Sequence, residues 1–167
     1  MNILCPHCQR DFEYLANLSA KGLLSIGENV LVQVHDAQTR QLLSEQHIHN
    51  MVTNSGLQFV RYLIDETQQG CTYFATGTDL SATVAAHTAL GNEVYRNTIS
   101  SRVKVDFEIT QRCFIAPSAA NGNTLYEAGL FNASSGGTLF SRVVHDAIAK
   151  TISNTVTYSW THTIGRA

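Results

Sequence analysis

The closing segment TVTYSWTHTI alternates strictly between two kinds of side chain. Val156, Tyr158, Trp160, His162 and Ile164 fall on one side of an extended chain, and five hydroxyl residues fall on the other. Successive side chains of a β-strand point to opposite faces of its sheet. This period of two therefore predicts a strand with one buried face and one exposed face.

The same period recurs in several other segments. In SRVKVDFEIT, four apolar residues face one way and four charged residues face the other; the apolar ones are Val103, Val105, Phe107 and Ile109. LYEAGLF, the turn residues NASSGG and TLFSRVV together predict a hairpin. Near the start, Val30 to Val34, the turn DAQTR and a strand over about residues 41–48 predict another. Such strands predict a mainly β fold, an antiparallel β-sandwich or jelly-roll-like domain.

One helix is predicted, in TNSGLQFVRYLIDE. Its large apolar residues fall on one broad side at helical spacing: Leu57, Phe59, Val60, Leu63 and Ile64. Asn54 or Ser55 is suited to cap its first turn. After it, CTYFATGT predicts a short strand that ends at Gly77, and residues 79–93 predict a loop.

The first residues differ from the rest of the chain. We divide the sequence into an N-terminal arm, residues 1–27, and a β-sandwich domain, residues 28–167. The arm holds Cys5 and Cys8 in a C-x-x-C pair, which is the spacing of half a tetrahedral zinc site. A second C-x-x-C or an H-x-x-x-H motif, the usual other half, does not occur in the chain.

Zinc is the one cofactor that the sequence suggests. His47 and His49 are its first candidates for the two missing ligands, because alternate residues of a strand share one face. His7, His35 and a neighbouring subunit are the other candidates. The alternative is a structural turn with reduced thiols, and a redox role is disfavoured because no βα pattern follows to activate a thiolate.

Composition excludes several classes of partner and sets the expected compartment. The net charge is −2 without a basic cluster, which disfavours nucleic-acid binding. No apolar stretch reaches the ~18 residues of a membrane span, and the N-terminus does not read as a signal peptide. We expect assembly in the host cytoplasm. Only 14% of the residues are charged, so the surface is neutral and suits contact with other proteins.

Isolated reactive residues have structural interpretations. Cys71 and Cys113 lie in apolar segments and are expected to be buried free thiols. His162 is expected to be a core or interface histidine, and His145 with Asp146 lacks the nucleophile context of a hydrolase. No catalytic residue is assigned, and we expect a protein that is not an enzyme.

Four charged positions are candidates for ion pairs. Glu93 and Arg96 are three residues apart. Glu127 stands in an apolar strand and is expected to pair with Arg96 or Arg142. A surface pair would contribute little, whereas a buried pair would fix the register of strands or a contact between subunits.

From about residue 50 to residue 165, the sequence resembles small virion proteins of tailed bacteriophages. Four segments in this order carry the resemblance: NMVTNSGLQFVRYLI, YFATGTD with HTALGNEVYR, YEAGLFNASSGGTLFSRV, and TVTYSWTHTI. The residues Leu90, Glu93 and Arg96 match the family pattern in the second segment. The arm with its C-x-x-C departs from that pattern.

The resemblance implies a non-enzymatic building block of a virus particle, located at the tail, the baseplate or a fibre attachment. Capsid decoration is one alternative, and a receptor- or carbohydrate-binding module is another. The implied partners are other virion proteins and further copies of the chain, with a trimer preferred among symmetric states. A zinc-ribbon regulator is disfavoured, because the basic surface and the complete metal motif are missing.

Overall fold

The computed structural model describes residues 24–64 and 70–166 of the chain. These residues form ten strands and one helix. The elements are β1 (Leu24–Asp36), β2 (Leu42–His49), β3 (Met51–Val52), α2 (Asn54–Ile64), β4 (Tyr73–Gly77), β5 (Glu93–Thr98), β6 (Ser101–Val105), β7 (Glu108–Ile115), β8 (Thr124–Phe131), β9 (Leu139–Ala149) and β10 (Asn154–Arg166).

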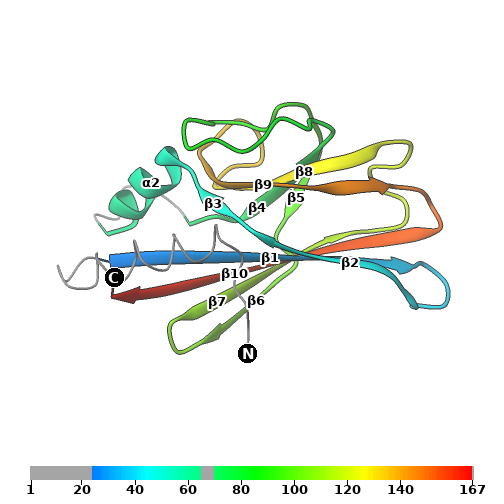
Figure 1. Ribbon diagram of the computed structural model, residues 1–167, viewed down its shortest axis with the longest axis horizontal. Helices are drawn as coiled ribbons and strands as arrows, with labels where there is room; N and C mark the ends of the chain where they lie inside the picture. The colour runs from blue at the N-terminus through cyan, green and yellow to red at the C-terminus, as the bar shows by residue number, and fades with distance from the viewer. Residues whose placement is uncertain (1–23, 65–69, 167) are drawn as a thin grey trace.

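The strands form two five-stranded antiparallel sheets that face each other (Figure 1). Sheet A has the order β2-β1-β10-β7-β6, and sheet B has the order β3-β9-β8-β4-β5. The chain passes between the sheets at the β2–β3, β5–β6, β7–β8 and β9–β10 connections. The predicted mainly β, antiparallel sandwich is confirmed.

The first and last strands described are paired along their whole length. Leu24 is opposite Arg166 and Asp36 is opposite Asn154, so β1 and β10 form the centre of sheet A. The strand begins at Leu24, before the clear alternation that starts at Asn29. The boundary drawn between residues 27 and 28 therefore falls inside a strand, and residues 1–23 of the arm lie outside the described residues.

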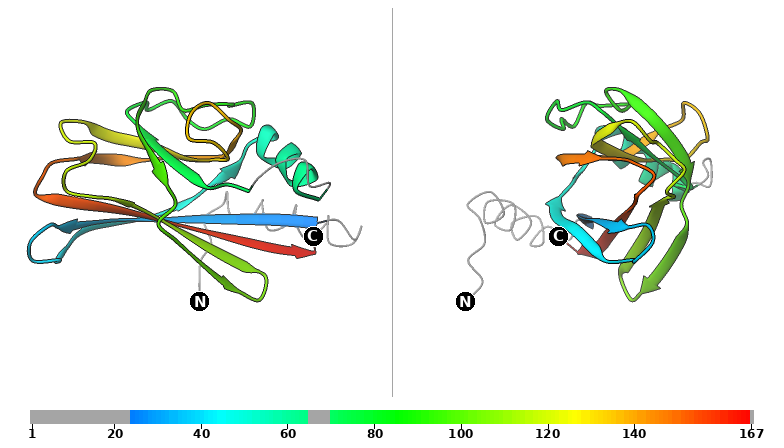
Figure 2. Two further views of the ribbon diagram at one scale, coloured as in Figure 1. Left: turned by 180° about the vertical axis from the view of Figure 1, so that it is seen from behind. Right: turned by 90° about the vertical axis from the view of Figure 1, so that its right-hand side faces the viewer.

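The core lies between the inner faces of the two sheets. Sheet A contributes Val30, Val32, Tyr158 and Trp160 at 0–1% exposure, which confirms the alternation read in the closing segment. Sheet B contributes a matching set of buried side chains: Phe74, Leu125, Ala128, Leu130, Val143 and Ile148. A view along the long axis shows the two layers curving around this core (Figure 2).

Sheet B is also covered on its outer face, by the loop between Gly77 and Glu93. This loop has no helix or strand, as predicted. Its Leu90 packs with Ala75, Phe131 and Leu139 in a second, smaller apolar cluster. Because this cluster covers the outer face, β8 is buried on both faces, although its alternation alone predicted one exposed face.

The segment SRVKVDFEIT is not one strand but a hairpin. β6 ends at Val105 and β7 begins at Glu108, with Asp106 and Phe107 as a two-residue turn. Asp106 has φ +49°, a left-handed conformation that Asp tolerates better than most residues. The hairpin reverses the chain inside the alternating segment, so Val103, Val105 and Phe107 are exposed instead of buried.

Helix α2 begins after Thr53, which is its N-cap. The Thr53 hydroxyl accepts a hydrogen bond from the Gly56 N–H at 3.0 Å, and the Thr53 carbonyl accepts one from the Leu57 N–H. The prediction of Asn54 or Ser55 as the cap is therefore wrong by one or two residues. Phe59 is buried as predicted, whereas Leu57 is 54% exposed, so the apolar side of the helix is narrower than its sequence indicated.

The cap can be tested against the residue that the sequence suggested. Thr53→Ala removes the capping hydroxyl, which is fully buried and also donates to the Leu139 carbonyl at 2.8 Å. We expect it to lower the free energy of unfolding by about 1–2 kcal/mol. The matched control is Asn54→Ala at the neighbouring exposed position, expected within about 0.5 kcal/mol of wild type. Urea unfolding measures both, and equal losses would contradict the assignment of Thr53.

Candidate interaction surface

The outer face of sheet A, turned away from sheet B, is rich in hydroxyl groups and carries few charges. The strand register sets side chains of neighbouring strands in rows across this face. One row runs from His49 through Asn29, Thr161 and Thr110 to Val103. Within it, the Thr110 and Thr161 hydroxyls are 3.0 Å apart. The five hydroxyl residues predicted to share one side of β10 lie on this face.

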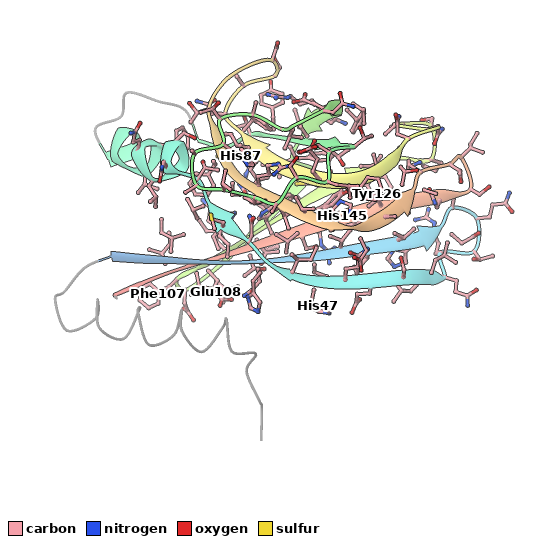
Figure 3. All side chains as sticks on the ribbon, turned by 45° about the horizontal axis from the view of Figure 1, so that its top comes forward. His47, His87, Phe107, Glu108, Tyr126 and His145 are labelled. Atoms are coloured by element: carbon pink, nitrogen blue, oxygen red, sulfur yellow. The ribbon has the colours of Figure 1, made fainter. Side chains whose placement is uncertain are left out.

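The β6–β7 hairpin adds apolar side chains at one margin of the outer face. Val103 is 57% exposed, Val105 is 59% exposed and Phe107 is 75% exposed. We call these three residues the hairpin patch. Figure 3 shows Phe107 and His47 on the side of sheet A away from β9. Single exposed apolar residues are ordinary, but neighbouring ones at a sheet margin are typical of a contact surface.

β6 is also an edge strand. It pairs with β7 on one side, and in the sheet order that the structure describes no strand lies on its other side. All five of its residues are exposed. An edge strand presents unpaired N–H and C=O groups that can bind a further strand. The hairpin patch and this edge together form the candidate interaction surface.

The predicted zinc ligands are only partly placed by the structure. Cys5, Cys8 and His7 lie outside the described residues. His47 and His49 share the outer face of sheet A, as predicted, and both are exposed. The His47 Nε2 atom lies 2.9 Å from a carboxylate oxygen of Glu45. Within residues 24–64 and 70–166 no group of three or more metal-binding side chains is found, so zinc stays a prediction.

The predicted pair of Glu127 and Arg142 is formed and is fully buried. The Arg142 Nε donates to Glu127 Oε2 at 2.8 Å, and the two side chains are 1% and 0% exposed. Glu127 also accepts hydrogen bonds from the backbone N–H groups of Asp79, Gly91 and Asn92. The carboxylate therefore receives four donors, three of them from the loop that covers sheet B.

Arg142 extends the same network to the other end of that loop. Its Nη2 donates to Asp79 Oδ2 at 2.9 Å, and its Nη1 donates to the Ser81 carbonyl at 2.9 Å. Nη1 also lies 3.2 Å from His87 Nδ1. Asp79, Ser81 and His87 were not singled out in the sequence, because nothing in a loop without periodicity indicates which residues an arginine will reach.

Glu93 and Arg96 form the second predicted pair at the surface of sheet B. The Arg96 Nη2 donates to Glu93 Oε2 at 2.6 Å. Arg96 also donates to the carbonyls of Ala133 and Gly136, and its guanidinium lies 3.8 Å from the ring centroid of Phe131. This pair therefore fixes the β8–β9 turn against β5.

Neither buried histidine is part of a catalytic triad. The His145 Nε2 atom lies 3.0 Å from the Tyr158 hydroxyl, and its Nδ1 lies 2.8 Å from the Asp146 backbone carbonyl. Burial lowers the pKa of His145, which keeps this ring neutral. His162 is buried as expected, with its Nδ1 2.6 Å from Glu28 Oε1 in an ion-pair geometry and its Nε2 3.2 Å from Gln111 Oε1.

Cys71 and Cys113 are free thiols, as predicted. Cys113 is fully buried and Cys71 is half-buried. Burial raises the pKa of Cys71 to about 12 and also raises the pKa of Cys113. Both side chains therefore stay protonated at neutral pH, which fits packing rather than nucleophilic chemistry.

Comparison with known proteins gives no assignment. No family model, no curated protein and no solved structure matches the chain. Among the described helices, none is long and apolar enough to cross a membrane.

The role of the buried carboxylate can be tested by Glu127→Gln. The amide would place an NH₂ group against some of the four donors that now converge on the carboxylate, and it would remove the fully buried charge that pairs with Arg142, leaving only the pair with Asp79. Breaking a buried pair in this way costs about 3–5 kcal/mol. The matched control, Glu93→Gln at the partly exposed pair, is expected to cost no more than about 1 kcal/mol. Denaturant unfolding that gives equal losses would contradict a special role for Glu127.

The zinc prediction is tested by metal analysis of the purified protein. An intrachain site of Cys5, Cys8, His47 and His49 requires about one zinc per chain, lost in both Cys5→Ser and His47→Ala, because a site with three ligands binds more weakly. His35→Ala, which removes another histidine from the same face of sheet A, is the control and is expected to keep its zinc if His47 and His49 are the ligands. If His47→Ala still binds zinc, the missing ligands are residues other than His47. A wild-type protein without zinc, and unchanged melting in Cys5→Ser, would leave CPHC as a turn.

Proposed function

We propose that this protein is a non-enzymatic structural subunit that assembles through protein–protein contacts. The observation that supports this proposal best is the hairpin patch on an open sheet edge. Monomeric proteins usually protect such edges, with bulges, inward-pointing charges or covering loops. In β6 the cations Arg102 and Lys104 point inward, but the outward side chains are the uncharged Ser101, Val103 and Val105, and the pairing of β6 with β7 has no bulge.

We further propose that the assembly is a bacteriophage virion, formed in the host cytoplasm. This part rests on the sequence resemblance. The tail, the baseplate or a fibre attachment is the proposed location, and capsid decoration is the alternative. A receptor- or carbohydrate-binding module is favoured less, because Trp160, Tyr158 and Phe74 are buried between the sheets instead of standing in exposed loops.

The strand chemistry favours a cyclic arrangement such as a trimer over a two-fold pairing of β6 with itself. An antiparallel pairing centred on Val103 would set Arg102 of one copy opposite Lys104 of the other. Like charges directly opposite each other on paired strands are destabilising. A contact between unlike surfaces avoids this conflict and generates a ring when its rotation closes. The other edge of sheet A, β2, offers exposed Leu42 and Leu43 for such a contact.

Self-association is tested with the double variant Val105→Thr, Phe107→Ser. Both side chains are more than half exposed, so the free energy of unfolding is expected to stay within about 0.5 kcal/mol of wild type. Burial of these side chains in an interface would contribute about 1.5–3 kcal/mol each. Self-association is therefore expected to weaken by at least about tenfold.

The control is Ile152→Ser, an equally exposed residue in the turn at the opposite end of β10. Sedimentation equilibrium over a concentration series measures all three proteins, and binding to purified virions measures incorporation. The proposal fails if the wild type is monomeric throughout and does not bind virions. Equal weakening by Ile152→Ser would show that the contact lies elsewhere.

A further inference from the structure

A cavity lies between helix α2 and the inner face of sheet A. Its volume is about 290 Å³, at the lower end of the roughly 300–1,000 Å³ that is usual for small-molecule sites. Figure 1 shows β1 and β10 continuing past the end of sheet B at the place where α2 lies. Sheet A therefore faces the helix here instead of another sheet, and a helix does not fill the whole space.

The walls of the cavity are apolar. Ile26, Ile109 and Ile164 contribute from sheet A, and Phe59 and Phe140 contribute from the opposite side. The polar groups at its base are already paired with each other. His162 is bonded to Gln111 and lies against Glu28, and Gln111 Nε2 lies 3.5 Å from the Cys71 carbonyl. A ligand therefore does not need to bind these groups, and its buried part is expected to be apolar.

Two cations lie at the margin of the cavity. Arg102 and Lys104 are on the inner face of β6, opposite Gln111 and Ile109 of β7, and both are exposed. Arg102 Nη2 donates to the Cys71 carbonyl at 2.9 Å, which holds the guanidinium near the cavity. This is the only hydrogen bond of Arg102 to the described residues. Within the described residues its remaining N–H donors have no acceptor, and no Asp or Glu of those residues lines the cavity.

We propose that this cavity binds a small amphipathic carboxylate, with its alkyl chain against the isoleucines and its carboxylate on Arg102. A guanidinium can donate two parallel hydrogen bonds to one carboxylate, which gives both affinity and orientation. Lys104, two residues away on the same face, adds a second positive charge. The small volume limits the chain to medium length. Binding does not depend on assembly, because Val105 and Phe107 of the hairpin patch do not line the cavity.

The test uses sodium decanoate as the probe, the full chain, and isothermal titration calorimetry. We expect saturable binding to the wild type, and binding at least about tenfold weaker to Arg102→Gln, because one charge-assisted contact is lost. The matched control is Arg112→Gln, which removes the same charge from the outer face of β7. It is expected to bind like wild type. Decan-1-ol, which has the same chain without the carboxylate, is expected to bind at least about tenfold more weakly than decanoate.

Two further measurements separate loss of the site from loss of the fold. Thermal melting shows whether each variant is folded, and Ile109→Trp, which fills the cavity, is expected to block decanoate. The proposal is overturned if wild-type binding is not saturable, if the probe is excluded because another segment of the chain occupies the cavity, or if Arg102→Gln and Arg112→Gln bind equally. Val105→Thr with Phe107→Ser is expected to bind decanoate normally, so failure of the assembly proposal would leave this one standing.

Discussion

The buried carboxylate of Glu127 joins β8 to β9 and holds the loop 78–92 against sheet B. A buried charge is tolerated only when it is neutralised and hydrogen-bonded. Glu127 accepts one hydrogen bond from Arg142 on the neighbouring strand and three from backbone N–H groups of the loop 78–92. The loop is therefore held over the sheet at both of its ends, and Leu90 is placed in the apolar cluster with Phe131 and Leu139. That face of sheet B is therefore covered by its own loop, whereas no described loop covers the outer face of sheet A.

Sheet A has the opposite character. Its outer face carries many Thr, Ser, Asn and Gln side chains, which hydrate readily, and few charges, among them Glu45, Glu108 and Arg112. Charges usually keep a protein apart from its copies, and this chain has few of them. The apolar residues of the hairpin patch then have little electrostatic opposition to contact. The pairs of Glu93 with Arg96 and of Glu127 with Arg142 both lie in sheet B, away from this face.

Alternation predicted the strands well, because the period of two is set by backbone geometry. It predicted the buried face of β10 and the strand that ends at Gly77. For Glu127 it left open whether the partner was Arg96 or Arg142 and whether the pair was buried, and the structure gives a buried pair with Arg142. The alternation gave a wrong prediction where the chain turns back on itself and the apolar and polar residues still alternate. The turn at Asp106 and Phe107 holds neither Gly nor Asn, so SRVKVDFEIT shows no strong hairpin signal. The cap at Thr53 was missed because three possible capping residues stand in a row, and the sequence does not show that the Gly56 N–H bonds to the first of them. The cavity was beyond prediction, since it depends on how far one sheet extends past the other.

The two proposed contacts use opposite faces of one strand. In β6 the outward residues Val103 and Val105 belong to the hairpin patch, and the inward residues Arg102 and Lys104 belong to the cavity. A slip of one residue in the pairing of β6 with β7 would exchange these sets, moving the cations to the neutral face and the valines into the cavity. The short turn opposes this slip. Asp106 takes the positive φ that a two-residue reversal requires, and the Phe107 carbonyl accepts a hydrogen bond from the Ile164 N–H of β10 at 2.9 Å. The end of the hairpin is thereby tied to the central strands of sheet A, and this backbone contact helps to fix which face of β6 carries the hairpin patch and which faces the cavity.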